Sequence, residues 1–365
     1  MAHSADPVAI DDLEQFAAAN LDKDSFDYYS SGSGEDVTLR ENRQAFKRIK
    51  LRPRMLRDVS HQDISVTVLG HKLSMPICVS PTACHELAHS EGELATVRGV
   101  SAMGTAMALS ILSNKSVEDV AMESPHTVKF FQIQFFTDRQ MMTSLLKRAR
   151  HAGYKAIVLT VDSPCRGKHK SRTNFRVPEH LQFGNLVSFQ EEKGFKTNKE
   201  LLTYCDESGD RSVDWTNLDW LRSITSLPVV VKGILTAEDA RLAVHHGAQG
   251  IVVSNHGGRL LDGVPATIEV LPEIVEAVQG TGVEVYLDGG VRQGTDVLKA
   301  LALGARAVFV GRPVIWGLAY KGEQGVITAL KMLKDELKVA MTLTGCASLK
   351  DITPSLVTKQ SFCHL

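Results

Sequence analysis

The amino-acid sequence predicts an α/β fold, a closed (β/α)8 barrel, and three observations support this prediction. Eight short apolar runs recur along the 365 residues, and continuous runs of this length are typical of buried parallel strands. The stretches between the runs have the apolar spacing of helices. The first run is followed by Pro81-Thr82-Ala83, whereas a doubly wound sheet, the alternative arrangement, normally has a glycine-rich turn there.

The expected strands, in chain order, are 77–79, 106–109, 130–133, 157–160, 229–231, 251–253, 285–287 and 308–310. One connecting helix shows clear signals for its start, its inward face and its end. Thr236 caps it, Asp239 closes a capping box and Gly247 ends it. Its apolar stripe consists of Ala240, Ala243 and Val244. The segment 295–304 repeats this pattern after the seventh strand.

Further segments flank the barrel, which we place at about residues 75–345 of a single domain spanning 1–365. Residues 1–70 form an N-terminal helical extension, in which Phe26-Asp27-Tyr28-Tyr29 lies on a helix, and its tyrosines could equally be packing aromatics. The segment 176–214 follows the fourth strand, is polar and has few apolar repeats, so we expect a long loop over the barrel mouth. This loop is either a lid over the mouth or a surface loop without a functional role.

The composition excludes several classes of protein. The 41 basic and 42 acidic residues are well mixed and leave a net charge of −1, so neither nucleic acid nor an anionic membrane is an expected partner. No run approaches the roughly 18 apolar residues of a membrane-spanning helix. Residues 1–10 lack the basic and apolar segments of a secretory signal. We therefore expect a soluble, unsecreted protein.

The cysteines have no metal-type spacing, so we expect neither a metal site nor a disulfide framework, and we interpret them as reduced packing residues. They are Cys78, Cys84, Cys165, Cys205, Cys346 and Cys363. The tripeptide Cys363-His364-Leu365 has the small, basic, leucine form of the Ser-Lys-Leu address for peroxisomes. It predicts a peroxisomal protein; the alternative is a chance ending and a cytoplasmic location.

A histidine and an arginine three residues apart follow the sixth strand, in Ser254-Asn255-His256-Gly257-Gly258-Arg259. An imidazole takes up a proton near neutral pH, and a guanidinium grips a carboxylate with two hydrogen bonds, so the pair suits removal of hydrogen from a small carboxylic acid. Asp162 follows strand four, where it either orients the imidazole or caps the next loop. Lys232 follows strand five, where a cation either offsets the charge of a reduced flavin or forms a Schiff base.

Glycines and arginines after the last two strands predict a phosphate site. Asp288-Gly289-Gly290-Val291-Arg292 follows strand seven and Gly311-Arg312 follows strand eight, where barrels of this kind usually bind an anion. We therefore expect a phosphorylated cofactor or substrate; the alternative is that these glycines serve only tight turns. The other strand ends carry further groups that face the same mouth: Pro81, Thr82, Ala83, Ser110, Gln132, Gln134, Thr160 and Ser254.

Together these motifs resemble those of the FMN-dependent 2-hydroxy-acid oxidases, the glycolate oxidase group that includes long-chain hydroxy-acid oxidase. The similarity extends over nearly the whole chain, from Phe26-Asp27-Tyr28-Tyr29 to Gly311-Arg312-Pro313. The resemblance implies a (β/α)8 barrel, FMN as cofactor, a 2-hydroxy acid and oxygen as reactants, and a homotetramer or higher oligomer. The residues it assigns to FMN are Pro81, Thr82, Ala83, Ser110, Gln132, Thr160, Lys232, Ser254, Asp288, Gly289, Gly290, Val291, Arg292, Gly311 and Arg312.

The resemblance also implies a role for each reacting group. His256 is the base that removes the hydroxyl or α proton of the substrate, and Asp162 supports it. Arg259 and Tyr28 bind the substrate carboxylate, and Lys232 stabilises the negative charge of the reduced flavin. The expected reaction converts an L-2-hydroxy acid to a 2-oxo acid, with oxygen reduced to H2O2.

Four positions depart from the family pattern, and three of them bear on the substrate. Gln134 stands where the family usually has a tyrosine, His169 where a second arginine normally follows strand four, and Leu112 where glycolate oxidases have a tryptophan; Leu260 replaces a usual glutamine. Each lost charge-assisted hydrogen bond costs roughly 1.5 to 3 kcal/mol, so we do not expect efficient oxidation of glycolate. Because Leu112 is smaller than tryptophan, it should leave space for a longer or aromatic side chain, so we expect a substrate larger than glycolate. The alternatives are a dehydrogenase with another electron acceptor, an altered substrate that uses Gln134 and His169, and a flavin-binding protein without catalysis.

Overall fold

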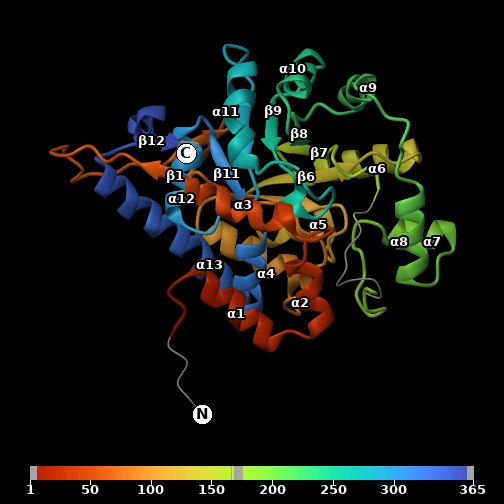
Figure 1. Ribbon diagram of the computed structural model, residues 1–365. Helices are drawn as coiled ribbons and strands as arrows, with labels where there is room; N and C mark the ends of the chain where they lie inside the picture. The colour runs from red at the N-terminus through yellow and green to blue at the C-terminus, as the bar shows by residue number, and fades with distance from the viewer. Residues whose placement is uncertain (1–5, 166, 168–175, 360–365) are drawn as a thin grey trace.

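The computed structural model describes residues 6–165, 167 and 176–359, and within them eight parallel strands form a closed barrel (Figure 1). The strands are β4 (Ile77–Val79), β5 (Ala106–Ser110), β6 (Val128–Gln134), β7 (Ala156–Thr160), β8 (Val229–Ile234), β9 (Gly250–Val253), β10 (Glu284–Leu287) and β11 (Ala307–Val310). Each strand pairs with the next in the chain, and β11 closes the barrel against β4, with Val308 opposite Ile77. Every predicted apolar run lies in one of these strands, so the predicted fold class is confirmed.

A helix follows each barrel strand in the described part of the chain, which completes the (β/α)8 pattern. These helices are α4 (Gly92–Ala102), α5 (Val117–Glu123), α6 (Arg139–His151), α9 (Thr216–Ile224), α10 (Ala237–His245), α11 (Thr267–Ala277), α12 (Gly294–Ala302) and α13 (Arg312–Thr344). A short 3-10 turn, η1 (His85–Leu87), precedes α4, and another, η3 (His256–Gly258), follows β9.

Strand side chains divide between two apolar cores, which explains why the runs are apolar throughout rather than alternating. One set points into the barrel, where the Phe309 ring lies 5.6 Å from Tyr286 and 6.4 Å from Phe130 between ring centroids. The other set, with Ile157 and Val231, packs against the surrounding helices. Because side chains fill the barrel, a ligand binds at its end rather than in a central pore.

The predicted N-cap and the predicted end of the helix around 236–247 are confirmed. The Thr236 Oγ1 accepts a hydrogen bond from the backbone N–H of Asp239 at 3.2 Å, and Gly247 ends the helix with a φ of +75°. Ala240 and Ala243 are buried. The Asp239 carboxylate accepts a hydrogen bond from the Thr236 hydroxyl at 3.1 Å instead of from the Thr236 backbone N–H, so the predicted capping box is not formed.

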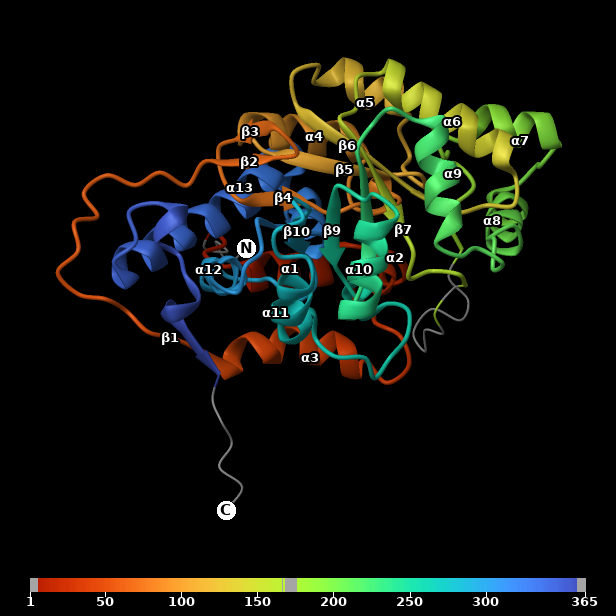
Figure 2. The ribbon, with the colours of Figure 1, turned by 90° about the horizontal axis from the view of Figure 1, so that it is seen from above.

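The N-terminal extension packs on the outside of the barrel, covers its bottom and reaches its mouth through Tyr28. It contains α1 (Ile10–Asn20), α2 (Lys23–Ser30), α3 (Val37–Arg48), β1 (Ile49–Leu51) and the hairpin of β2 (Val66–Val68) and β3 (His71–Leu73). The first two helices pack on α13, α3 lies beside α11 (Figure 2), and the hairpin joins the core inside the barrel. Near the end of the chain, the turns η4 (Leu349–Asp351) and η5 (Pro354–Leu356) lead to β12 (Val357–Lys359), which pairs antiparallel with β1. The predicted helix around Tyr28 is α2.

The segment 176–214 differs from the prediction of a polar loop with few apolar repeats. It contains two helices, α7 (Val187–Lys193) and α8 (Asn198–Glu207), which lie to one side of the barrel in Figure 1. The long excursion after the fourth strand is present, but the expectation of a loop throughout was wrong, because apolar residues that are spaced irregularly along the sequence come together in the fold. The buried ones are Val177, Leu181, Phe183, Leu186, Phe189 and Leu201. The role of this segment as a lid stays a prediction.

No disulfide bond joins the cysteines of the described residues. Cys165 is exposed, and Cys78, Cys84, Cys205 and Cys346 are buried. Cys363, with the tripeptide that it begins, lies outside the described residues. Within the ranges that the structure covers, no helix combines the length and the apolar character needed to cross a membrane.

Candidate active site

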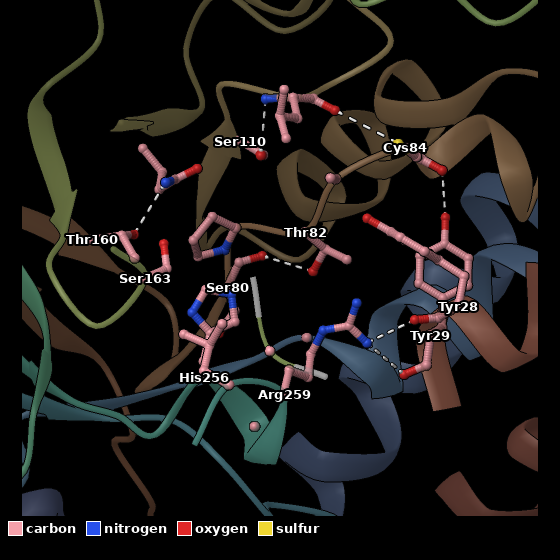
Figure 3. A pocket seen from close by; sticks show the side chains of 18 of the residues that line it. Tyr28, Tyr29, Ser80, Thr82, Cys84, Ser110, Thr160, Ser163, His256 and Arg259 are labelled. Carbon is pink, nitrogen blue, oxygen red and sulfur yellow. Dashed lines mark hydrogen bonds between the residues drawn. The ribbon is translucent and has the colours of Figure 1, made fainter. Parts of the chain in front are cut away.

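A cavity of about 940 Å³ opens at the C-terminal ends of the barrel strands, where barrel enzymes have their active sites (Figure 3). The predicted site residues that line it are Tyr28, Pro81, Thr82, Ala83, Ser110, Leu112, Gln132, Gln134, Thr160, Lys232, His256, Arg259, Asp288, Gly289, Gly290, Val291, Arg292, Gly311 and Arg312. Asp162 and Ser254 lie behind the cavity wall, against residues that do line it. His169 lies outside the described residues.

The His256 ring is held by Asp162, the aspartate that follows β7. The Nδ1 atom of His256 lies 3.0 Å from Asp162 Oδ1, and the backbone of His256 has a strained, left-handed φ of +57°. Burial acts to raise the pKa of Asp162, but the charges of His256 and Lys232 and the hydrogen bond to His256 together hold it below its ordinary value. An ionised Asp162 keeps a proton on Nδ1 and leaves Nε2 of His256 to accept another.

A glycine makes room for this aspartate. Gly233 follows Lys232 in β8 with a φ of +115°, and a Cβ atom there would lie 2.6 Å from the Cβ of Asp162. Any side chain at position 233 would therefore displace Asp162 from His256.

Ser254 fixes both Lys232 and His256 from behind the cavity. Its Oγ accepts a hydrogen bond from Lys232 Nζ at 3.1 Å and another from the backbone N–H of His256 at 3.0 Å. Lys232 Nζ also lies 3.5 Å from Asp288 Oδ2. The lysine is thus a cation held in place beside the cavity, which suits a charge partner for a bound anion better than a mobile nucleophile.

Arg259 and Tyr28 form the opposite side of the cavity. The Arg259 guanidinium lies 5.2 Å from the centre of the Tyr28 ring, and its Nη1 donates to the Tyr28 carbonyl at 2.7 Å. Burial lowers the pKa of Arg259, an effect that Tyr28 and Tyr29 oppose. Among the described residues nothing accepts a hydrogen bond from Nε or Nη2, so these donors are available to a carboxylate. Tyr29 is buried and donates to the Cys84 carbonyl, so it is a packing residue (Figure 3).

The turn after β10 has the features of an anion site. Gly289 and Gly290 both have positive φ, and a Cβ atom on Gly290 would lie 2.0 Å from the Asn42 carbonyl oxygen. Burial lowers the pKa of the neighbouring Arg292, whose Nη1 donates to the Val291 carbonyl at 2.9 Å. The Nε of Arg292 is buried without a partner among the described residues. A buried, unpaired guanidinium N–H beside glycine backbone fits a phosphate group.

Arg312 has a second role that the sequence did not indicate. Its guanidinium donates to the backbone carbonyls of Tyr29 at 2.7 Å, Gly257 at 3.0 Å and Ser31 at 3.1 Å. It therefore ties the end of α2 to η3, the turn that carries His256, while it lines the cavity.

Polar groups of three neighbouring strands line the cavity in one row. Ser110 of β5 is opposite Gln132 of β6, and Gln134 of β6 is opposite Thr160 of β7. Gln132 Nε2 donates to Thr160 Oγ1 at 3.1 Å, and its Oε1 accepts from the backbone N–H of Ile111 at 3.3 Å. Such a row of donors and acceptors fits the polar edge of a flat heteroaromatic ring. Together with the phosphate turn, the residues present fit FMN.

The substrate side of the cavity includes residues that the sequence reasoning did not find. Gln134 Oε1 accepts a hydrogen bond from Ser163 Oγ at 3.4 Å, and Leu112 is half-buried in the lining of the same cavity. The segment 176–214 contributes apolar, polar and charged residues to the lining: Arg176, Val177, Glu179, Phe183, Lys199, Leu202, Thr203, Cys205, Asp206 and Gly209. The irregular apolar spacing from 177 to 189 was the signal available in the sequence.

A buried carboxylate, Glu93 of α4, braces the two loops that carry Cys84 and Leu112. It is fully buried and accepts hydrogen bonds from the backbone N–H groups of His85 at 3.2 Å, Asn114 at 3.1 Å and Lys115 at 3.2 Å. Burial raises the pKa of Glu93 from 4.5 to about 7, although these N–H donors act to lower it.

The raised pKa makes part of the stability pH-dependent. The folded protein holds the Glu93 proton more tightly than the unfolded chain, so this contribution is complete below pH 4.5 and is lost as pH rises towards 7. We expect the free energy of unfolding of the wild type, relative to Glu93→Gln, to fall by about 3 kcal/mol over this range. Urea unfolding at a series of pH values measures it, with the exposed Glu91→Gln as control. A constant difference between wild type and Glu93→Gln would contradict the expectation.

Comparison with known proteins agrees with the geometry. The family model described as FMN-dependent dehydrogenase matches residues 17–359. The chain is 51% identical to human 2-hydroxyacid oxidase 1 over 358 residues, 96% of each chain, and 50% identical to glycolate oxidase of Spinacia oleracea over 95% of this chain and 94% of that one.

Solved structures show the same similarity. A mandelate oxidase bound to 3,3-difluoro-2-hydroxy-3-phenylpropionic acid superposes with a TM-score of 0.86 at 40% identity, covering 96% of this chain and 98% of that chain. A soluble mutant of the membrane-associated (S)-mandelate dehydrogenase from Pseudomonas putida gives 0.89 at 32% identity, covering 97% and 99%. The chain therefore belongs to the FMN-dependent dehydrogenase family, with FMN as its cofactor and the oxidation of a 2-hydroxy acid as its reaction class.

Proposed function

We propose that the protein oxidises an L-2-hydroxy acid larger than glycolate to the 2-oxo acid, with oxygen as electron acceptor and H2O2 as product. One observation carries the proposal. The His256 base, backed by Asp162, and the Arg259 guanidinium, stacked on Tyr28, line the same cavity (Figure 3).

The residues divide the chemistry between them. Arg259 and Tyr28 hold the substrate carboxylate, which orients the hydroxyl-bearing carbon. Nε2 of His256 takes a proton from the hydroxyl or from the α-carbon, and Asp162 stabilises the resulting imidazolium. FMN, held by the turn after β10 and the polar row of Ser110, Gln132 and Thr160, would supply the acceptor for the two electrons that the substrate loses, and the Lys232 cation would offset the added negative charge. Oxygen then receives these two electrons and two protons, which gives H2O2.

The size of the substrate follows from the apolar lining. Leu112, Phe183 and Leu202 contribute apolar surface to the cavity, and the position of Gln134 offers no phenol for a small substrate. Burying each CH2 group contributes about 0.8 kcal/mol. Roughly three buried CH2 groups would offset one lost charge-assisted hydrogen bond. The side chain of a larger 2-hydroxy acid supplies such groups, and glycolate has none.

The variant Leu112→Trp tests this size preference. We expect the larger ring to lower kcat/KM for long or aromatic 2-hydroxy acids by about ten- to a hundredfold, the equivalent of 1 to 3 kcal/mol of overpacking. Activity on glycolate should stay or rise. Steady-state kinetics on both acids measures the ratio, and Leu343→Trp, at a position 66% exposed on α13, is the control. An unchanged ratio in Leu112→Trp would show that Leu112 does not limit the tail.

The electron acceptor needs its own test. Turnover in air should produce H2O2 and the 2-oxo acid in equal amounts. The likeness to (S)-mandelate dehydrogenase favours a second candidate, the same oxidation with an acceptor other than oxygen. Fast turnover with an artificial acceptor under nitrogen, together with negligible oxygen uptake in air, would establish that candidate and exclude the oxidase.

Location and assembly complete the proposal. Cys363-His364-Leu365 supports a peroxisomal address, although the tripeptide lies outside the described residues. A fluorescent fusion with and without these three residues tests it, since only the intact fusion should colocalise with peroxisomes.

The family resemblance supports a homotetramer. Light scattering of the purified protein measures the mass of the assembly and tests this.

A further inference from the structure

Asn185 joins the segment 176–214 to the cavity wall. Its side chain is 2% exposed, and its Nδ2 donates to the carbonyl of Ser110 at 3.3 Å, the carbonyl of Ile111 at 3.2 Å and Ser113 Oγ at 2.9 Å. Its Oδ1 accepts from the backbone N–H of Val117 at 2.9 Å. All four hydrogen bonds go to the end of β5 and the loop that leads to α5.

The backbone before Asn185 lies directly on the same loop. A Cβ atom on Gly184 would lie 2.4 Å from the backbone nitrogen of Ser116, so only glycine allows this approach. The Gly184 N–H donates to the carbonyls of Ser113 at 3.2 Å and Asn114 at 3.1 Å. The two stretches of chain, 70 residues apart in sequence, therefore form one unit in this part of the fold.

Arg148, which forms a salt bridge with Glu118, also donates a hydrogen bond to the backbone carbonyl of Asn185. Arg148 of α6 donates from Nη1 to this carbonyl at 2.8 Å, and its Nε and Nη2 donate to the Glu118 carboxylate of α5 at 2.9 and 2.8 Å. The main chain of Asn185 is thus anchored to α6, while its side chain is hydrogen-bonded to the end of β5. Because its main chain is fixed in this way, the Asn185 side chain fixes the position of the backbone at the end of β5 to which it is hydrogen-bonded.

The groups that Asn185 grips belong to the cavity wall. Ser110 and Leu112 both line the cavity, and Ser110 Oγ accepts from the Leu112 N–H at 3.1 Å. Phe183, two residues before Asn185, lines the same cavity and is 1% exposed. Asn185 itself does not line the cavity, so any effect on substrate acts through these neighbours.

We propose that Asn185 is a positioning residue that sets the cavity wall of Ser110, Leu112 and Phe183 and thereby the acceptance of the substrate side chain. The proposal rests on the proposed function, in which the tail of a 2-hydroxy acid lies along Leu112. The segment 176–214 then contributes to specificity through its buried residues Phe183 and Asn185.

The test compares Asn185→Ala with Asn198→Ala. Asn198 is a buried asparagine of the same segment, and its Nδ2 donates to the carbonyls of Pro178 at 2.8 Å and Leu181 at 2.7 Å, without reaching the barrel. Both variants lose buried hydrogen bonds, so both should melt at a lower temperature. Only Asn185→Ala should raise KM for a long 2-hydroxy acid, with kcat within about twofold of the wild type. The expected rise is about tenfold, the equivalent of one lost hydrogen bond.

A second readout needs no turnover. Because Ser110 lies on the cofactor side, Asn185→Ala should weaken FMN binding in a fluorescence titration, by about tenfold on the same grounds, and Asn198→Ala should not. If Asn185→Ala does not fold, Asn185→Ser, which keeps a hydroxyl donor, replaces it. Equal KM and FMN affinity in the two variants, or a fall in kcat alone, would overturn the proposal. A wild type that oxidises no hydroxy acid would instead contradict the proposed function and leave the FMN titration to decide on Asn185.

Discussion

Replacing His256 with asparagine should slow reduction of the bound flavin by substrate by about 10²- to 10⁴-fold, the usual contribution of a positioned base. The variant keeps a polar side chain but has no atom that takes up a proton near neutral pH. Asp162 lies behind the cavity wall, so it does not reach the substrate to act as the base in place of His256. Stopped-flow absorbance under nitrogen measures the rate directly.

A second histidine gives a matched control for this variant. His246 Nδ1 lies 2.8 Å from Asp219 Oδ2, a His–Asp pair between α9 and α10 that lies away from the cavity lining. His246→Asn should leave the rate of flavin reduction unchanged. A rate in His256→Asn within a few fold of the wild type, with flavin content retained, would remove His256 from the role of base.

Replacing Arg259 with methionine should raise KM for the acid by about ten- to a hundredfold, since a hydrogen bond to a charged group contributes about 1.5 to 3 kcal/mol. The variant keeps much of the apolar length over the Tyr28 ring but loses both the charge and the forked donors. The sharper measurement is the preference of the enzyme for a 2-hydroxy acid over its neutral amide. This ratio of kcat/KM values should fall towards unity.

Arg139 offers the control for the arginine. Its guanidinium lies 5.1 Å from the centre of the Phe135 ring and 4.6 Å from that of Trp220, and it pairs with Asp210, but it does not line the active-site cavity. Arg139→Met should cost stability without changing the preference for acid over amide. If Arg259→Met kept the full preference for the acid, another group would have to bind the carboxylate.

The barrel and the reacting groups could be predicted from sequence because both depend on local patterns. Strands buried on both faces are apolar throughout, and a closed barrel brings their C-terminal ends to one mouth. That geometry alone places Asp162, Lys232 and His256 together, although they are 70 and 24 residues apart in sequence. The contact of His256 with Asp162 is the outcome that the strand order implies.

The bracing of the site could not be predicted in this way. Asn185, Glu93 and Arg312 act through backbone groups of other segments, and no residue type at either end of such a bond identifies its partner. The apolar residues of 176–214 follow neither a helical nor a strand period before α7, so their shared core appears only in the fold. The residues that we propose to set specificity therefore lie in the part of the chain that sequence patterns describe least well.

The most direct test of the central claim is an anaerobic titration of the purified, FMN-loaded protein with L-2-hydroxy acids from glycolate to long-chain and aromatic members, followed by flavin absorbance. The proposed function predicts that the acids bleach the oxidised flavin, and that the larger acids do so at lower concentration than glycolate. A flavin that no member of the panel reduces, or one that glycolate reduces more readily than every larger acid, would contradict it.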